Sequence, residues 1–318
     1  MSDIQSDSSS ERPVLRLGTR RSPLAMAQAI ETRTRLCAAH GWSEEAVELV
    51  PVLASGDKIR DRPLAEIGGK ALWTKELDEW LAEGRIDAAV HSMKDVETLR
   101  PDALGIAAVL PREDVADVLV GASSITSIPQ GSVVGTSAPR RAAQMLHARS
   151  DCRIVTFRGN VATRLAKLQA GEADVTLLAA AGLSRLGEHG IGTRLDPDEW
   201  LPAPAQGAIG IECRRDDQRV IGLMGAIDDA PSHGAVMAER ALLAGLGGDC
   251  HSPIAVLTTH HDDRIELRCA LFSPDGSQRI ERSARGPMED LEWVAGLAHD
   301  LLANLTAGMK PYFGHKHG

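Results

Sequence analysis

The chain has 318 residues, of which 43% are apolar, and a formal net charge of −9 from 35 basic and 44 acidic residues. That apolar content allows a packed core, and the length predicts two domains or three small ones. Proteins that bind nucleic acid usually present a basic field or aromatic stacking platforms, whereas this chain is acidic and 3% aromatic. Its sequence also lacks an apolar run near the ~20 residues of a membrane span. We therefore expect no nucleic-acid partner and no membrane partner.

The start of the chain and its cysteines indicate the compartment. Residues 1–12 are rich in serine and have no basic stretch followed by an apolar one, so we expect a disordered tail and no export signal. The cysteines are odd in number and show no CxxC spacing: Cys37, Cys152, Cys213, Cys250 and Cys269. This pattern favours reduced thiols in a cytoplasmic protein.

His260–Asp263 (HHDD) is typical of a hairpin turn, and we expect no metal site.

Short apolar runs alternate with helical patterns in the first part of the chain. Strands are expected at Val14–Gly18, Val47–Ala54 and Ile86–His91. Between them, helices are expected from Pro23 to about His40, with Ser22 as N-cap, and over Thr74–Glu83. This βαβ alternation predicts a mainly parallel sheet covered by helices.

The same alternation restarts after residue 115. The expected strands are Ala116–Val120, Ser132–Gly135, Ile154–Phe157 and Asp174–Ala179. The expected helices are Ala138–Arg149 capped by Ser137, Asn160–Ala170 capped by Asn160, and a short helix to Gly187. Two such units predict two α/β domains that face a cleft.

The order of elements changes in the last third of the chain. Leu201–Gln206 (LPAPAQ) is rich in proline and predicts a crossing between domains. A small α+β domain is then expected from a helix, three strands and a last helix: Ala235–Leu246, Ile254–Thr258, Arg264–Phe272, Ser277–Ala284 and Met288–Leu305.

Positive charge gathers in the middle of this acidic chain. Gly131–Gly190 holds seven Arg and one Lys against four acidic residues, a local charge of +4. Arg140, Arg141 and Arg158 fall at strand-to-helix junctions, where helix N-termini already favour anions and a guanidinium matches a carboxylate. The pattern predicts a small ligand, rich in carboxylates or phosphates, bound between the domains. Ordinary surface arginines remain the alternative.

Three short motifs could carry chemistry. Asp95, beside Lys94, follows an apolar strand, where a carboxylate can transfer a proton or stabilise a cation; a loop ion pair is the alternative. Gly68-Gly69-Lys70 precedes a helix and could hold an anion, although it lacks P-loop spacing. Cys250 lies in a Gly-rich loop after a helix. A Cys–His protease and an inert cysteine both remain open for it.

Taken together, nine segments resemble the porphobilinogen deaminases, also called hydroxymethylbilane synthases, and occur in the family's order. They are Leu15–Ala29 (LRLGTRRSPLAMAQA), Gly68–Asp78 (GGKALWTKELD), Asp87–Val96 (DAAVHSMKDV), Pro111–Asp114 (PRED), Val134–Gln144 (VGTSAPRRAAQ), Phe157–Leu168 (FRGNVATRLAKL), Leu177–Gly187 (LLAAAGLSRLG), Pro202–Arg214 (PAPAQGAIGIECR) and Ala238–Ala255 (AERALLAGLGGDCHSPIA).

The resemblance implies an α/β protein with two domains like the lobes of periplasmic binding proteins and a small α+β C-terminal domain. Domain 1 is expected over 13–110 and 205–228, domain 2 over 111–204, and domain 3 over 229–318. The family also suggests a monomer.

The resemblance further implies the reaction. Four porphobilinogen molecules are joined head to tail with loss of ammonia, and water then releases linear hydroxymethylbilane. The growing tetrapyrrole is built on a dipyrromethane cofactor, which is held by a thioether at the position of Cys250. Loss of ammonia leaves an electron-poor azafulvene, and a fixed carboxylate stabilises the positive charge that spreads over the pyrrole nitrogens. Asp95 matches the family's catalytic aspartate.

Each pyrrole carries an acetate and a propionate, which explains an arginine-rich cleft. The residues expected to bind the cofactor, besides Cys250, are Lys70, Lys94, Thr136, Ser137, Arg140, Arg141, Arg158, Arg164 and Arg185. Those expected to bind the substrate are Arg20, Ser22, Arg158, Arg164 and Arg185.

Some residues depart from the family's usual pattern. Glu97 stands where proline is common, Trp73 replaces a frequent phenylalanine, and Asp249 precedes the cysteine in place of glycine. None of these removes Asp95, the paired arginines or Cys250, so activity is expected. A non-catalytic, two-lobed carboxylate-binding protein is the alternative function.

Overall fold

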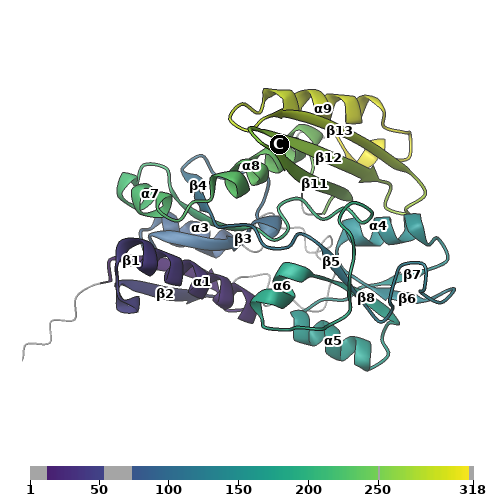
Figure 1. Ribbon diagram of the computed structural model, residues 1–318, viewed down its shortest axis with the longest axis horizontal. Helices are drawn as coiled ribbons and strands as arrows, with labels where there is room; N and C mark the ends of the chain where they lie inside the picture. Colours follow the sequence, from purple (N-terminus) through teal and green to yellow (C-terminus); the bar gives the residue numbers. More distant parts are fainter. Residues whose placement is uncertain (1–12, 54–73, 250, 315–318) are drawn as a thin grey trace, which may run out of the picture.

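The computed structural model describes residues 13–53, 74–249 and 251–314, which form three sheets (Figure 1). The predicted tail over 1–12 and the predicted site residues Lys70 and Cys250 lie outside the described residues. So does Trp73. Within the described ranges, no helix combines the length and the apolar character needed to cross a membrane.

The first lobe is built on a sheet with strand order β2-β1-β3-β10-β4. Its strands are β1 (Leu15–Arg20), β2 (Val47–Val52), β3 (Ala88–Ser92), β4 (Leu104–Val109) and β10 (Ile209–Arg214). Its helices are α1 (Pro23–His40), α3 (Lys75–Ala82) and α7 (Gln218–Gly225), with short 3-10 turns η1 (Glu44–Ala46) and η3 (Met93–Asp95). The core of this lobe includes Leu17, Leu36, Val90 and Ile211, all buried.

Residues at its two ends determine where helix α1 begins and ends. The Ser22 hydroxyl accepts a hydrogen bond from the Ala25 amide at 3.3 Å, and Pro23 occupies the first turn, where its missing N–H costs nothing. The helix ends at Gly41, whose φ of 67° is the left-handed conformation that favours glycine. The predicted cap and helix are confirmed.

The second lobe has a sheet with strand order β7-β6-β8-β5-β9. Its strands are β5 (Asp117–Val120), β6 (Val133–Gly135), β7 (Arg153–Val155), β8 (Val175–Ala179) and β9 (Thr193–Arg194). Its helices are α4 (Pro139–Ala148), α5 (Val161–Gln169) and α6 (Ala180–Arg185).

The expectation of mainly parallel sheets is wrong for half of the strand pairs. β1 pairs in parallel with β2 and β3, and β6 with β7 and β8. By contrast, β10 is antiparallel to β3 and β4, and β5 is antiparallel to β8 and β9. The reason is that β5 and β10 each follow a segment that crosses between the lobes, so they enter their sheets without a βαβ crossover helix.

One of two predicted caps in the second lobe is wrong. Asn160 caps α5 as predicted, because its side-chain oxygen accepts from the Thr163 amide at 2.9 Å. Ser137 does not cap α4, since Ala138 is the N-cap residue and makes no side-chain bond. The Ser137 hydroxyl instead donates to the Phe157 carbonyl.

The C-terminal part forms a third, antiparallel sheet in the order β11-β12-β13. Its elements are α8 (Ala230–Leu246), β11 (Ile254–His261), β12 (Arg264–Phe272), β13 (Arg279–Pro287), α9 (Glu292–Ala303) and η4 (Lys310–Tyr312). The α+β expectation is confirmed, as is the turn between β11 and β12, where Asp262 has a φ of 51°. Figure 1 shows α9 above this sheet and α4 of the second lobe below it.

Candidate active site

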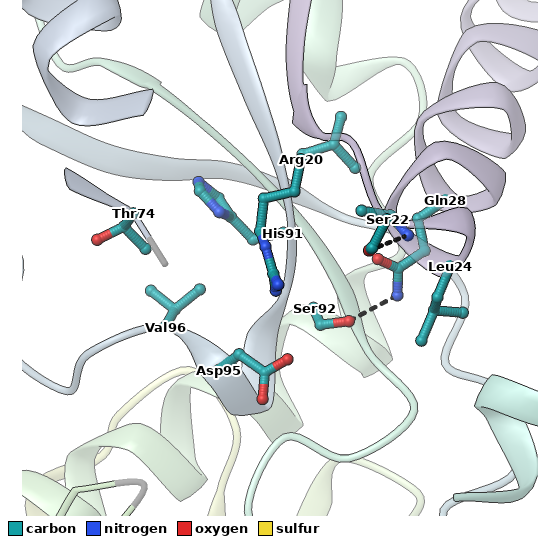
Figure 2. A pocket seen from close by; sticks show the side chains of 11 residues that line it. Arg20, Ser22, Leu24, Gln28, Thr74, His91, Ser92, Asp95 and Val96 are labelled. Atoms are coloured by element: carbon teal, nitrogen blue, oxygen red, sulfur yellow. Dashed lines mark hydrogen bonds between the residues drawn. The ribbon is translucent and has the colours of Figure 1, made fainter. Parts of the chain in front are cut away.

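A pocket lies at the carboxyl end of β3, where open α/β sheets usually place ligands. β3 ends at Ser92 and the 3-10 turn η3 follows directly, which brings Asp95 to the pocket (Figure 2). The residues that line it are Arg20, Ser22, Leu24, Ala25, Gln28, Thr74, Val90, His91, Ser92, Asp95 and Val96. The structure therefore brings the predicted residues Arg20 and Ser22 together with Asp95.

The sequence prediction included three of the eleven lining residues, and the residues that it missed include two buried polar ones, Gln28 and His91. Gln28 is buried on α1, and its amide nitrogen donates to the Ser92 hydroxyl at 2.7 Å, which ties α1 to the end of β3. His91 is buried as well, and its Nε2 lies 3.3 Å from a carboxylate oxygen of Glu212. Gln28 lies in one of the segments that resemble the family. A single polar residue on the buried face of a helix does not, however, indicate a site from sequence alone.

Positive charge surrounds the Asp95 end of the pocket. Burial lowers the pKa of the Lys94 ammonium to about 8. The guanidinium groups of Arg141 and Arg164 contribute to this lowering, and the Asp95 carboxylate opposes it. Burial also lowers the pKa of Arg164 to about 10, with Arg141 acting in the same direction and Asp95 against it. Arg158 acts on Arg164 as a further like charge. Asp117 opposes the lowering at Lys94 as Asp95 does, so burial is its main cause and repulsion between the cations adds to it.

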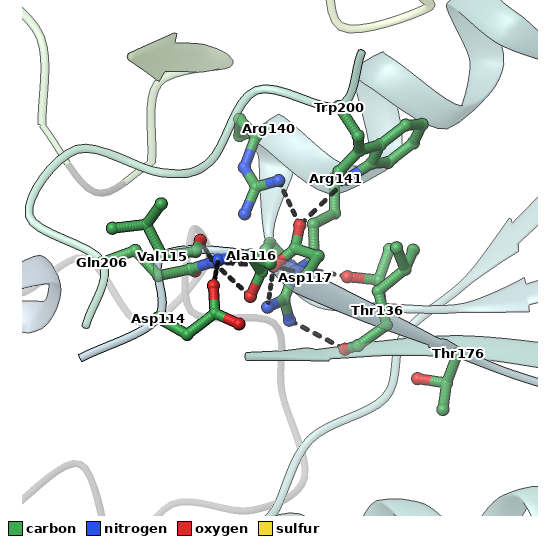
Figure 3. Close-up of polar contacts among 12 residues, drawn as sticks. Asp114, Val115, Ala116, Asp117, Thr136, Arg140, Arg141, Thr176, Trp200 and Gln206 are labelled. Carbon is green, nitrogen blue, oxygen red and sulfur yellow. Dashed lines mark hydrogen bonds and ion pairs between the residues drawn. The ribbon is translucent and has the colours of Figure 1, made fainter. Parts of the chain in front are cut away.

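The paired arginines lie at the start of α4 and are both buried (Figure 3). Arg140 and Arg141 donate to opposite oxygens of the Asp117 carboxylate, the Arg141 Nη2 at 2.7 Å. Burial opposes ionisation of Asp117, yet the two guanidinium groups hold its pKa well below the ordinary value. Sequence reasoning missed Asp117, because nothing local relates it to the arginines.

Three other predicted residues have partners within the protein. Arg185 bridges the lobes, with its Nε 3.2 Å from a Glu31 carboxylate oxygen and its Nη2 donating to the Gly207 carbonyl at 3.1 Å. The Thr136 hydroxyl accepts from the Ala138 amide at 3.2 Å. With the Ser137 bond to Phe157, both hydroxyls are engaged in the turn before α4. The structure thus places Arg185 in an interlobe contact rather than in the group around Lys94.

A buried ionic network supports the segment that follows Asp95. Arg100 donates to both oxygens of Glu212, at 2.9 and 2.8 Å, and to Glu97 at 2.9 Å. It also donates to Asp78 at 2.5 Å. Although burial opposes it, the contacts with His91 and Arg100 lower the pKa of Glu212 to about 2.

The same segment contacts α8 and the residues that directly follow it. The Arg240 guanidinium on α8 donates to the carbonyls of Glu97 and Thr98, at 2.7 and 3.0 Å. The Thr98 hydroxyl donates to the Gly248 carbonyl at 2.9 Å. The chain that presents Asp95 is therefore tied to α8 and to Gly248, which follows it.

The comparisons with known proteins agree with this arrangement. The family model described as porphobilinogen deaminase, dipyromethane cofactor binding domain, matches residues 15–222, and the one described as porphobilinogen deaminase, C-terminal domain, matches residues 234–303. The chain belongs to the porphobilinogen deaminase family.

Curated members of this family match almost end to end. The porphobilinogen deaminase of Sphingopyxis alaskensis is 53% identical over 305 residues, which cover 94% of this chain and 96% of that protein. That of Paracoccus denitrificans is 51% identical over 279 residues, covering 87% and 89%. Among solved structures, the periplasmic VFT2 domain of BvgS from Bordetella pertussis is 14% identical, with a TM-score of 0.41, over 72% of this chain and 94% of that one.

Proposed function

We propose that this member of the porphobilinogen deaminase family is a hydroxymethylbilane synthase, a transferase that joins four porphobilinogen molecules head to tail and releases the linear tetrapyrrole by hydrolysis. The placement of Asp95 carries the proposal. Its carboxylate lies in a pocket at the carboxyl end of β3, next to a surplus of cations that include Lys94 and Arg164. A substrate rich in carboxylates would neutralise that surplus and bring its ring nitrogens to Asp95.

The described residues fit a dipyrromethane cofactor. Two pyrroles bear four carboxylates, and Lys94 and Arg164 are cations whose pKa values are lowered chiefly by burial, so a bound carboxylate would stabilise their charged forms. When bound, the cofactor would supply the pyrrole α-carbon to which the first substrate is added, and a thioether to Cys250 would retain it. The remaining residues that we propose to hold it are Lys70, Thr136, Ser137, Arg140, Arg141, Arg158 and Arg185.

Asp95 is proposed to act on the reacting rings. In each addition the C–N bond of the aminomethyl group breaks and ammonia leaves. A C–C bond forms at a pyrrole α-carbon, and that carbon then loses its proton. Positive charge develops on the pyrrole N–H groups during both steps, and a fixed carboxylate that accepts from them lowers the barrier. We also assign proton transfer in these steps to Asp95, because its carboxylate lines the pocket and a carboxylate can accept and return protons.

The other pocket residues are proposed to orient the substrate. Arg20 and Ser22 line the same pocket as Asp95, so a carboxylate of the incoming ring can bind there. Arg158 and Arg164 extend the positive charge toward the second lobe. For Arg185 to bind a carboxylate, the ligand must replace its present acceptors on α1 and on the crossover at Gly207.

We propose the same domain division as the resemblance implies: 13–110 with 205–228, 111–204, and 229–318. The pairing of β10 with β3 and β4 supports the assignment of 205–228 to the first domain. The enzyme is further proposed to act as a monomer in the cytoplasm, without a nucleic-acid or membrane partner.

Stoichiometry tests the proposed function. Purified protein is incubated with porphobilinogen, and ammonia and tetrapyrrole are both quantified. A synthase releases ammonia and tetrapyrrole in a ratio of about four to one, with catalytic turnover. Binding of porphobilinogen without release of ammonia would instead identify a non-catalytic carboxylate-binding protein and would refute the proposal.

A further inference from the structure

The Asp117 carboxylate gathers donors from several parts of the molecule. Asp117 is the first residue of β5 and is 0% exposed. Arg141 donates to it through Nε at 3.2 Å and through Nη2 at 2.7 Å, and Arg140 donates through Nη1. The indole N–H of Trp200 and the side-chain amide of Gln206 each donate to it at 2.9 Å. Figure 3 shows these groups converging on the two carboxylate oxygens.

The charges around the start of α4 explain why a carboxylate is needed there. The first turn of α4 contains Arg140 and Arg141 and no acidic residue, and it is described in full. Cations at a helix N-terminus are unfavourable, because the helix dipole places its positive end there. Two buried guanidinium groups also repel each other. Asp117 offsets one of the two charges and leaves a net charge of about +1 on the trio.

Hydrogen bonds fix the orientation of Arg141 and leave one N–H of Arg140 without an acceptor among the described residues. The Arg141 Nη1 donates to the Leu177 carbonyl at 2.8 Å, so the Arg141 guanidinium is fixed on two sides. The Nε of Arg140 is buried and has no hydrogen-bond partner within the part of the chain that the structure describes. An acceptor from a bound ligand would satisfy it.

Asp117 also joins the arginine pair to both segments that cross between the lobes. β5 begins immediately after the crossover from β4, and Trp200 and Gln206 lie on the returning crossover. The Gln206 amide nitrogen donates in addition to the Val115 carbonyl at 2.7 Å. One carboxylate therefore holds the two crossovers and the two arginines in a single arrangement.

We propose that Asp117 is a positioning residue for the reaction: it orients Arg140 and Arg141 for carboxylates of the cofactor and the growing chain. The proposal rests on the proposed function, in which those arginines bind such carboxylates. Asp117 itself is buried among protein donors and does not touch the ligand in this role.

The test compares four variants with the wild-type holoenzyme. Asp117→Asn removes the charge, Asp117→Glu restores it with displaced oxygens, and Trp200→Phe removes one donor without a change in charge. Asp151→Asn is the matched control, because Asp151 is also an Arg-paired aspartate of the second lobe but its side chain is 30% exposed. For each protein we measure the melting temperature, the covalent cofactor content by intact mass, and kcat and KM for porphobilinogen.

We expect Asp117→Asn to reduce the cofactor content by more than about half and to raise KM at least about fivefold in the loaded fraction, with partial recovery in Asp117→Glu. Trp200→Phe should raise KM about two- to threefold with kcat preserved, and Asp151→Asn should leave both constants unchanged.

The proposal is overturned if Asp117→Asn folds with normal cofactor content and KM, or if Asp151→Asn changes KM equally. If Asp117→Asn does not fold, Trp200→Phe decides: an unchanged KM with a lowered melting temperature shows a purely structural role. A wild-type protein with neither cofactor nor turnover would refute the proposed function instead, whatever the variants do.

Discussion

Replacement of Arg100 by leucine removes a guanidinium that donates to three carboxylates behind the Asp95 pocket. Its bonds to Glu212 are 2.9 and 2.8 Å long, and the Arg100 and Glu212 side chains are 7% and 0% exposed. Glu97 and Asp78 would lose the same partner. Because a buried ion pair that loses one member leaves an uncompensated charge, we expect the variant to be less stable by about 3–5 kcal/mol at neutral pH.

The pKa of Glu212 sets the pH dependence of that loss. Despite burial, which opposes ionisation, this pKa is lowered from 4.5 to about 2, which corresponds to about 3 kcal/mol of native-state stability. A lowered carboxyl pKa contributes this stability above pH 4.5 and loses it as the pH falls toward about 2. The stability difference between wild type and Arg100→Leu should therefore shrink below about pH 4.

Urea unfolding at neutral pH and near pH 3 measures both effects. Arg282→Leu is the control, because Arg282 bonds Asp300 at 2.9 Å in an exposed pair, and such pairs contribute less than about 1 kcal/mol. The double variant Arg100→Leu with Glu212→Leu should recover part of the loss, since it removes the charge left behind. A loss below about 1 kcal/mol for Arg100→Leu, or one that does not change with pH, would refute this reasoning.

Three further predictions concern residues of the proposed reaction. Asp95→Asn should retain the cofactor mass but lower kcat about 10²–10³-fold, as loss of a preorganised electrostatic group does; normal turnover of porphobilinogen would contradict this role. Cys250→Ser should lack the mass excess and melt at a lower temperature than the holoenzyme, because a ligand held by the folded state stabilises it; full cofactor content would argue against Cys250 as the tether. Since the Lys94 pKa of about 8 lies below its ordinary 10.5, its positive charge is lost as the pH rises through about 8. Cofactor assembly on the apo-protein should slow over that range and become independent of pH in Lys94→Arg, and equal pH profiles for both proteins would refute the assignment.

Elements with local signals could be predicted from the sequence. α1 begins at a Ser22-Pro23 pair and ends at Gly41, and α5 begins after Asn160, so each boundary depends on neighbouring residues. The antiparallel strands could not be predicted in the same way, because β10 pairs with β3 and β4 across more than a hundred residues. Ser137 illustrates the same limit: its hydroxyl bonds a carbonyl 20 residues away in place of the local cap.

The same distinction between local and long-range contacts applies to the candidate site. Asp95 could be predicted because the strand and the turn that present it are contiguous in sequence. The partners of the arginines could not, since Asp117 precedes Arg140 by 23 residues and Glu212 follows Arg100 by 112. Glu97, which departs from the family's usual proline, accepts from Arg100 and from the Thr74 hydroxyl at 2.8 Å. The departure thus has a structural role that sequence alone did not reveal.

We propose that Cys250 tethers the growing tetrapyrrole to the enzyme while Asp95 acts on it. Intact-mass spectrometry of the purified, active protein, followed by mapping of its peptides, would detect this tether. We expect a mass excess of two linked pyrrole units, located on the peptide that contains Cys250. An active enzyme whose Cys250 peptide carries no added mass would contradict it.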